Sequence, residues 1–432
     1  MIDGHRYTPG PTPTTAPASP PHHSVTASVP RIALAHDWLV GYRGGEAVLD
    51  HIARVAQGMG TVAGLYTMFA DREGIGSFPP GAPGGGAGVR GIGSVHASFL
   101  NRMPGARRFR RWMLPLYPRA VEELSRRLEA EHRRAPIDLL ISTSSAAIKG
   151  LRPPAGVPHL CYCHTPARYL WSQAGQYATG GGGGLRALGL RVFGAGLREW
   201  DRKTAANVTR FMANSTHVQS EIRRCYGRES AVVHPPVRTD FFTPDPSVLR
   251  EDFWLCAGAL EPYKRVDAAI GAARIARKRL VVVGRGSQGA SLRRLARGCG
   301  ADVTFVDDAD DAKLRDLYRR AAALLFPQVE DFGIVAAEAQ ACGTPVAACG
   351  AGGALDTVID GETGVLFRDA ARSSLPEALA RAAGRCEQMR GASDRCRANA
   401  ERFGAAVFEH FIRGQISAAL GAGAEGGTAQ VG

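Results

Sequence analysis

The chain has 432 residues, of which 45% are hydrophobic and 22% charged, and its formal net charge is +13; this length allows two domains with full cores, and the composition is that of a soluble globular protein. No apolar run reaches the ~20 residues that span a bilayer, and the N-terminus lacks the basic start and apolar core of a secretory signal, so we expect neither a membrane span nor secretion. The positive charge suits an anionic membrane surface, an anionic substrate or solubility alone, whereas the lack of zinc-finger spacing, an aromatic sheet signature or a recognition helix argues against a nucleic-acid partner.

Residues 1–29 are rich in Pro, Thr, Ser and Ala, and residues 421–432 are rich in Gly and Ala. Such segments bury too little apolar surface to offset their ordering entropy, so both tails are predicted to be disordered. Between them, strand and helix signals alternate in two runs. This pattern predicts an α/β protein with two doubly wound, Rossmann-like domains facing across a cleft, at residues 30–235 and 251–403, joined by a linker at 236–250.

The first domain opens with an apolar strand at residues 32–38, followed by a loop that contains Gly44 and Gly45 and by a helix over about 46–57. Strand, glycine loop and helix form a geometry in which the backbone approaches a ligand closely. Asp37 stands beside this loop. The alternative is that the glycines serve only as structural punctuation.

A glycine-rich loop at residues 81–93 leads to a predicted edge strand, and a basic, aromatic stretch follows it. Arg107, Arg108, Arg110 and Arg111 alternate there with Phe109, Trp112 and Leu114. This mixture suits an anionic bilayer interface. An ordinary solvated basic face with inward aromatics is the equal alternative.

Residues 137–143 form a predicted buried strand, and the strand after it ends at His164, before Pro166. A histidine at the carboxyl end of a strand lies beside the ligand crevice of a doubly wound sheet, so His164 is a candidate catalytic residue. Trp171 could stack on a sugar face or pack in the core. Cys161 and Cys163 share a strand face, but without a second pair they predict free thiols in a reducing cytoplasm rather than a metal site.

A flexible loop is predicted at residues 180–184, an Arg-rich helix at 185–206, and a strand at 211–215 in which Ser215 caps the next helix. In the second domain a strand ends at Gly258, and Lys264 and Arg265 stand at a helix start. Cations there suit a diphosphate clamp, with a plain basic helix face as the alternative. Gly284 and Arg285 follow the next strand and are expected to border the nucleotide base.

Residues 323–326 read as a buried strand, 328–332 as a polar loop and 334–341 as a helix. Glu330 lies in the loop and Glu338 about two turns down the helix. The backbone amides of the segment Phe332, Gly333, Ile334 would face an anion at the helix terminus. One acid near a phosphate-linked group and another placed for vicinal hydroxyls suit a nucleotide sugar.

The spacing Glu330-x7-Glu338, followed by GTPV and GGALDTV, resembles the signature of family-4 retaining glycosyltransferases of GT-B fold. The match is close to the bacterial mannosyltransferase-like members that build surface polysaccharides, and it covers residues 31–416. The resemblance implies transfer of a hexose, with GDP-mannose as donor, to a lipid-linked or glycan acceptor. It also implies a reaction without a metal or other cofactor.

The resemblance further implies residue roles. His164 would lie against the donor sugar, and Gly44 and Gly45 would lie near the donor phosphates and the acceptor, with Asp37 beside them on the acceptor side. A last helix at 404–420 would cross back to the first domain. Two positions depart from the family: Ala259 stands where many relatives carry a phosphate-binding Arg, and the Glu46-Ala47 order is inverted. The implied location is cytoplasmic, with peripheral contact at the inner face of the cell membrane if the basic stretch binds lipid.

Two other functions fit the same features. A non-catalytic nucleotide-sugar-binding protein is favoured only by Ala259. A sugar-nucleotide epimerase shares the architecture, but its product would form without an acceptor.

Overall fold

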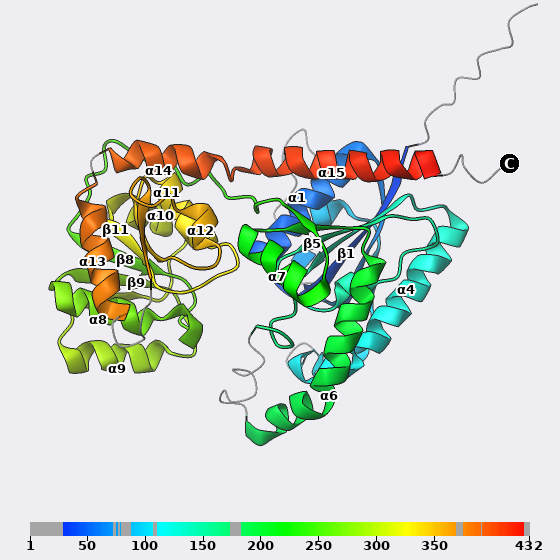
Figure 1. The fold of residues 1–432 in the computed structure, drawn as a ribbon, viewed down its shortest axis with the longest axis horizontal. Helices are drawn as coiled ribbons and strands as arrows, with labels where there is room; N and C mark the ends of the chain where they lie inside the picture. The colour runs from blue at the N-terminus through cyan, green and yellow to red at the C-terminus, as the bar shows by residue number, and fades with distance from the viewer. Residues whose placement is uncertain are drawn as a thin grey trace, which may run out of the picture.

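The computed structural model describes residues 29–71, 75–76, 78, 88–106, 110–172, 183–368, 375–389 and 391–426. Two parallel sheets, each covered by helices, form two lobes that lie side by side (Figure 1). The α/β architecture with two doubly wound domains is therefore confirmed. The expectations for residues 1–28, the loop at 81–87, Arg107, Arg108 and Phe109 lie outside the described residues, as does most of the loop at 180–184.

The N-terminal lobe has the strand order β3-β2-β1-β4-β5-β6-β7, with parallel neighbours. Its elements are β1 (Arg31–Leu39), α1 (Gly44–Met59), β2 (Thr61–Ala70), β3 (Val95–Ala97), α4 (Tyr117–Arg134), β4 (Leu139–Ser144), β5 (His159–Cys163), α6 (Gly183–Thr204), β6 (Arg210–Ala213), α7 (Thr216–Tyr226) and β7 (Ser230–Val232). The predicted edge strand is β3, at the end of the sheet. Ser215 caps α7 as expected, because its hydroxyl accepts a hydrogen bond from the Val218 amide at 3.1 Å.

The C-terminal lobe has the order β10-β9-β8-β11-β12-β13. Its elements are β8 (Phe253–Ala257), α8 (Val266–Ala276), β9 (Arg279–Val283), α9 (Gly289–Cys299), β10 (Val303–Val306), α10 (Asp311–Arg320), β11 (Ala323–Phe326), α11 (Ile334–Ala341), β12 (Val346–Cys349), α12 (Ala354–Thr357), β13 (Gly364–Phe367), α13 (Leu375–Glu387), α14 (Ala392–Glu401) and α15 (Ala405–Gly426). The central strands are apolar and buried, as expected for a sheet covered on both faces.

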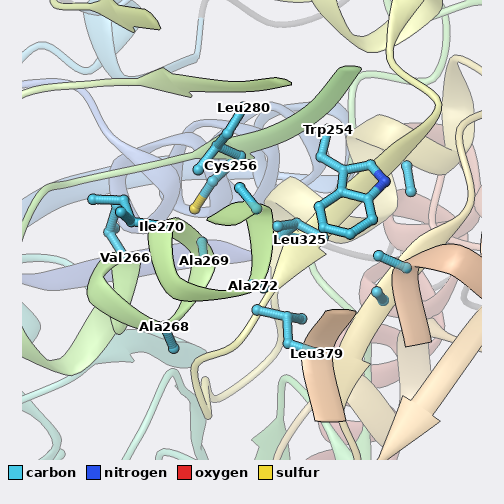
Figure 2. Close-up of a cluster of buried hydrophobic side chains, with 14 of the residues drawn as sticks. Trp254, Cys256, Val266, Ala268, Ala269, Ile270, Ala272, Leu280, Leu325 and Leu379 are labelled. Atoms are coloured by element: carbon cyan, nitrogen blue, oxygen red, sulfur yellow. The ribbon is translucent and has the colours of Figure 1, made fainter. Parts of the chain in front are cut away.

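One face of this second sheet is sealed by α8 and α13 (Figure 2). Small side chains on α8, such as Ala269 and Ala272, let the helix approach the strands closely. Larger side chains from the strands and from α13, among them Trp254, Leu325 and Leu379, fill the space around them. This packing makes the sheet a rigid platform, so the loops at its carboxyl edge have fixed starting points.

Both lobes have a topological switch point, where the chain changes the direction in which it adds strands. It lies between β1 and β4 in the first lobe and between β8 and β11 in the second. Loops that leave the carboxyl ends of two such strands diverge to opposite faces of the sheet, and ligands bind in the crevice between them. We therefore expect the ligand-binding residues in the segments that follow β1, β4, β8 and β11.

The chain's last helices connect the lobes. After α14 on the second lobe, α15 extends along the first lobe and packs against α1 (Figure 1). Phe408, Ile412 and Ile416 are at most 2% exposed in the N-terminal core. Helix α15 extends to Gly426, beyond the predicted boundary at 420.

Among the described residues, no helix has the length and the apolar character that crossing a membrane requires. In the basic stretch, the guanidinium of Arg110 lies over the ring of Trp38, 5.9 Å from its centroid. Trp112 is 44% exposed. One aromatic of this stretch therefore faces outward, while at least one arginine packs against the fold.

Candidate functional site

The switch point of the C-terminal lobe brings together Lys264 and Glu330, which are 66 positions apart in the sequence. Lys264 ends a short 3₁₀ turn, Pro262–Lys264, after β8, and Glu330 lies in the loop after β11. The ammonium group forms an ion pair with the carboxylate, and Gln328 donates a hydrogen bond to the same carboxylate oxygen at 3.0 Å. The two side chains are 13% and 17% exposed, so the pair is accessible at one edge.

The loop that carries Glu330 is held by a second turn, after β12. The Gly353 amide donates to the Glu330 carbonyl at 2.8 Å. A Cβ on Gly353 would lie 2.3 Å from the Cα of Phe332, so only glycine allows this approach. The turn thus fixes the direction in which Glu330 points.

Helix α11 starts at Ile334, after Gly333, whose φ of +92° favours glycine. The ring of Phe332 is buried against Val237 and Phe403, between the lobes. The side chain of Phe332 therefore has a packing role, and this residue can meet a ligand only through its backbone.

Glu338 lies on α11 and is 9% exposed. Its partner is Tyr318, whose hydroxyl donates a hydrogen bond to it at 3.4 Å. Burial raises the pKa of the Glu338 carboxyl to about 7, and the positive charge of Arg238 opposes that rise. The two acids of the predicted signature thus have different environments: Glu330 is paired with a cation, whereas Glu338 is buried beside a tyrosine hydroxyl.

In the N-terminal lobe, Gly45, the second residue of α1, lies between two histidine rings. A Cβ at this position would lie 3.7 Å from Nε2 of His164 and 3.8 Å from Cε1 of His36. Nδ1 of His36 shares a 2.5 Å hydrogen bond with the hydroxyl of Thr143, and its Nε2 lies 3.9 Å from Glu46. Sequence reasoning overlooked His36, although it stands beside Asp37 at the end of β1.

The charges of this cluster are set by burial and by the neighbouring groups. Burial lowers the pKa of His164 to about 3, so its ring is neutral at physiological pH, and its Nε2 is buried with no hydrogen-bond partner among the described residues. Burial raises the pKa of Glu46, but the hydrogen bond and charge of His36 outweigh this effect and the pKa is lowered. An ionised acid and a neutral imidazole with a free nitrogen therefore flank Gly45.

Glu46 also helps to cap the first turn of α1. Its carboxylate accepts a hydrogen bond from the Arg43 amide at 3.1 Å, which is the acidic half of a capping box.

Asp37 has a structural role, contrary to its assignment to the acceptor side. It is 1% exposed, and its carboxylate accepts hydrogen bonds from the backbone amides of residues 145–148 at 2.6 to 2.9 Å. A carboxylate that already accepts this many hydrogen bonds has no free lone pair for a hydroxyl of the acceptor substrate. It joins the loops after β1 and β4.

Trp171 is likewise structural. Its indole N–H donates to Asp201 at 2.7 Å, and Tyr226 donates to the same oxygen at 2.9 Å. Asp201 is buried in an ion pair with Lys149, at 2.9 Å. These contacts favour the core-packing alternative for Trp171, and stacking on a sugar stays a prediction.

Three other predicted residues have partners elsewhere. Arg265 has a φ of 53° and lies 3.5 Å from Asp267. Arg285 pairs with Asp308, and both side chains are more than half exposed. A Cβ on Gly284 would lie 2.0 Å from the carbonyl oxygen of Gly258, so Gly284 is required for the close approach of two turns.

The lobes meet at Arg168, which the sequence analysis did not select. Arg168 follows His164 by four residues, and its guanidinium forms an ion pair with Asp331, the neighbour of Glu330. The hydroxyl of Ser215 also bonds to the Asp331 carbonyl, at 2.5 Å. The segment that bears His164 is therefore tied directly to the loop that bears Glu330.

No group of three or more His, Cys, Asp or Glu residues is arranged to hold a metal ion in the part of the chain that the structure describes. The cysteines form no disulfide bonds in the part of the chain that the structure describes, and most of them are buried.

Comparisons with known proteins agree with this geometry. Residues 43–241 match the family model described as Glycosyltransferase Family 4, and residues 238–403 match Glycosyl transferases group 1. A D-inositol 3-phosphate glycosyltransferase of Gordonia bronchialis is 32% identical over 258 residues, 53% of this chain and 54% of the relative. A second, from Catenulispora acidiphila, is 39% identical over 36% of this chain and 44% of the relative. The chain thus spans about half the length of these curated relatives.

Solved structures show the fold. The lipopolysaccharide outer core galactosyltransferase WaaB, in apo form, has a TM-score of 0.62 at 16% identity, covering 90% of this chain and 99% of its own. Sucrose-phosphate synthase from Thermosynechococcus elongatus has a TM-score of 0.66 at 20% identity, covering 91% and 99%. HepE from Anabaena, in complex with UDP, has a TM-score of 0.63 at 17% identity, covering 90% and 100%. The GT-B fold that the resemblance implied is confirmed.

Proposed function

We propose that this chain, which matches family-4 and group-1 glycosyltransferase models and has the GT-B fold, is a retaining glycosyltransferase that uses a nucleoside diphosphate hexose. One observation carries the proposal. The Lys264–Glu330 pair lies at the switch point of one lobe and is joined through Asp331 and Arg168 to the segment of the other lobe that bears His164.

In this mechanism the barrier is cleavage of the sugar–phosphate bond, where negative charge develops on the diphosphate. Lys264 exchanges Glu330 for the phosphate. The backbone amides at the start of α11, near Gly333, are already oriented to stabilise the negative charge on the diphosphate. Glu330, released from the lysine, accepts hydrogen bonds from the hydroxyls of the donor sugar. Glu338 accepts from the ribose.

The N-terminal lobe supplies the other side of the sugar. The neutral ring of His164 has an unpaired Nε2, which can accept a hydrogen bond from a sugar hydroxyl or donate one near the reacting carbon. The acceptor hydroxyl attacks on the face from which the diphosphate leaves, and a phosphate oxygen takes its proton. The proposal gives the reaction no resident metal or organic cofactor.

For the substrates, we propose GDP-mannose as donor and a lipid-linked or glycan acceptor in surface polysaccharide synthesis. The curated relatives are named D-inositol 3-phosphate glycosyltransferases, and HepE was solved with UDP-glucose, so these compounds belong in any test. Peripheral contact with an anionic membrane is supported by the exposure of Arg102, whose side chain is 75% exposed, and of Trp112.

The test is a donor panel followed by turnover. GDP-mannose, UDP-glucose and UDP-N-acetylglucosamine are titrated by calorimetry, and the donor that binds is then offered polyprenyl-diphosphate sugars and D-inositol 3-phosphate. Transfer with retained anomeric configuration supports the proposal. Binding without transfer to any acceptor indicates a non-catalytic binder, and a new sugar nucleotide formed without acceptor indicates an epimerase.

A further inference from the structure

Arg168 is placed beside the donor-phosphate site although it belongs to the other lobe. It follows β5, and its guanidinium pairs with Asp331. Glu330 and Tyr263, the neighbour of Lys264, also act electrostatically on its pKa, so all these groups lie close together. Its side chain is 34% exposed, so it remains open to an incoming ligand.

The charges of this cluster cancel without a ligand. Lys264 pairs with Glu330, and Arg168 pairs with Asp331. An incoming diphosphate carries at least two negative charges and must displace carboxylates to gain cations. The other cation after β8, Arg265, is engaged with Asp267 at 3.5 Å, and position 259 is alanine. Lys264 alone would leave the diphosphate half neutralised.

Arg168 has the chemistry to supply the second cation. A guanidinium presents a planar fork of N–H groups that matches two phosphate oxygens, whereas lysine offers a point charge. Asp331 is buried, which raises its pKa, and Arg168 is the main group that opposes this rise. Asp331 can therefore take up a proton when Arg168 leaves it, so the exchange does not strand a buried charge.

We propose that Arg168 is a donor-binding residue: its guanidinium leaves Asp331 and binds the diphosphate of the nucleotide sugar opposite Lys264. This inference rests on the proposed function. The diphosphate then replaces Asp331 as the link between the lobes, so that donor binding, rather than a protein ion pair, connects the two halves of the site.

The test compares nucleotide binding by variants of the full chain, with GDP and GMP or UDP and UMP as probes in calorimetry. Arg168→Met should weaken diphosphate binding on the order of 10- to 100-fold, the worth of a charged hydrogen bond, and weaken monophosphate binding less. Asp331→Asn frees Arg168 and should leave diphosphate affinity unchanged or raise it. Arg152→Met, which removes an exposed pair with Glu122, is the control.

If Arg168 instead only holds the two lobes together through its ion pair with Asp331, a different result is expected. If Arg168→Met and Asp331→Asn weaken diphosphate binding equally, the ion pair itself matters and the inference is overturned. If Arg168→Met lowers the melting temperature too far for titration, Arg168→Lys decides, since it should lose part of the affinity and keep the fold. Wild-type protein that binds no nucleoside diphosphate overturns the proposed function as well; normal binding by Arg168→Met overturns this inference alone.

Discussion

At the scale of single residues, Lys264 and Glu330 define the candidate site by neutralising each other. Their ion pair is largely buried, so the cost of desolvating both charges offsets much of their attraction and the pair is weak evidence for a role in stability. We infer that the ion pair has a functional role, because each of the two groups can exchange its partner for a charged or hydroxylated part of the donor.

Lys264→Ala and Glu330→Ala should each lower transfer on the order of 10²-fold while the fold is kept, because each removes a group that acts on the leaving diphosphate or on the sugar. The measurement is release of nucleoside diphosphate in the presence of acceptor, with melting temperature as the check on folding. Lys313→Ala, which removes an exposed pair with Asp316, is the matched control. Wild-type turnover in both site variants would remove these residues from the mechanism.

Glu338 gives a prediction on pH and stability. Its folded pKa of about 7 lies above the ordinary value of 4.5, so the folded state binds more protons between these values. Stability should therefore fall as pH rises from about 4.5 to about 7, by on the order of 3 kcal/mol at most.

Glu338→Gln removes this titration and should make the stability profile flatter. The measurement is the free energy of urea unfolding at pH 5 and pH 8 in both proteins, and the quantity of interest is the difference between the two profiles. Parallel profiles would show that the carboxyl is not held in an apolar environment.

At the scale of elements, the start of α1 is built for close approach. Gly45 leaves the space between the rings of His36 and His164 free, whereas Gly58, near the end of the same helix, has open space around it. Glycine therefore keeps space free for the site at the start of α1, whereas a Cβ near the end of α1 would meet no neighbouring atom.

Gly45→Ala should retain the fold, because its methyl group would meet ordinary contacts of 3.7 to 3.9 Å. It should lower turnover on the order of 10-fold by filling the space that the sugar needs beside His164. Gly58→Ala should raise stability by about 0.5 to 1 kcal/mol and leave turnover as it is. Equal turnover in both variants would place the histidines outside the reaction path.

At the scale of the whole molecule, α15 joins the lobes by packing a chain terminus of the second lobe into the core of the first. Phe408 is 2% exposed and Phe411 is 50% exposed on the same helix. Variants of these two residues therefore measure how much the docking of α15 contributes to the free energy of unfolding.

Phe408→Ala should lower the free energy of unfolding of the N-terminal lobe by about 3 to 5 kcal/mol, because it leaves a cavity beside α1. Phe411→Ala should change it by less than ~0.5 kcal/mol. Urea unfolding followed by far-UV circular dichroism gives both values. Similar losses in the two variants would mean that α15 does not dock in solution as it does in the structure.

The order of elements was predictable because it depends on local patterns. The helix predicted at residues 334–341 is α11, and the strand predicted at 323–326 is β11. These patterns are local: they are apolar runs of strand length, glycine turns and helix caps such as Ser215. Because each involves only a few neighbouring residues, it can be recognised in the sequence alone. The signature of Glu330 and Glu338 is also local, and it led directly to one end of the candidate site.

Partners distant in sequence were decided by the tertiary structure. The sequence placed Asp37 beside the loop of Gly44 and Gly45, but only the register of β1 and β4 directs its carboxylate to the amides of residues 145–148. Arg168 and Asp331 are 163 positions apart, and no local pattern joins them. Chain-local chemistry therefore determined the elements and the donor-binding motif, whereas burial and the packing of the lobes decided which charged groups face each other, because pairing energies depend on distances that only the fold sets.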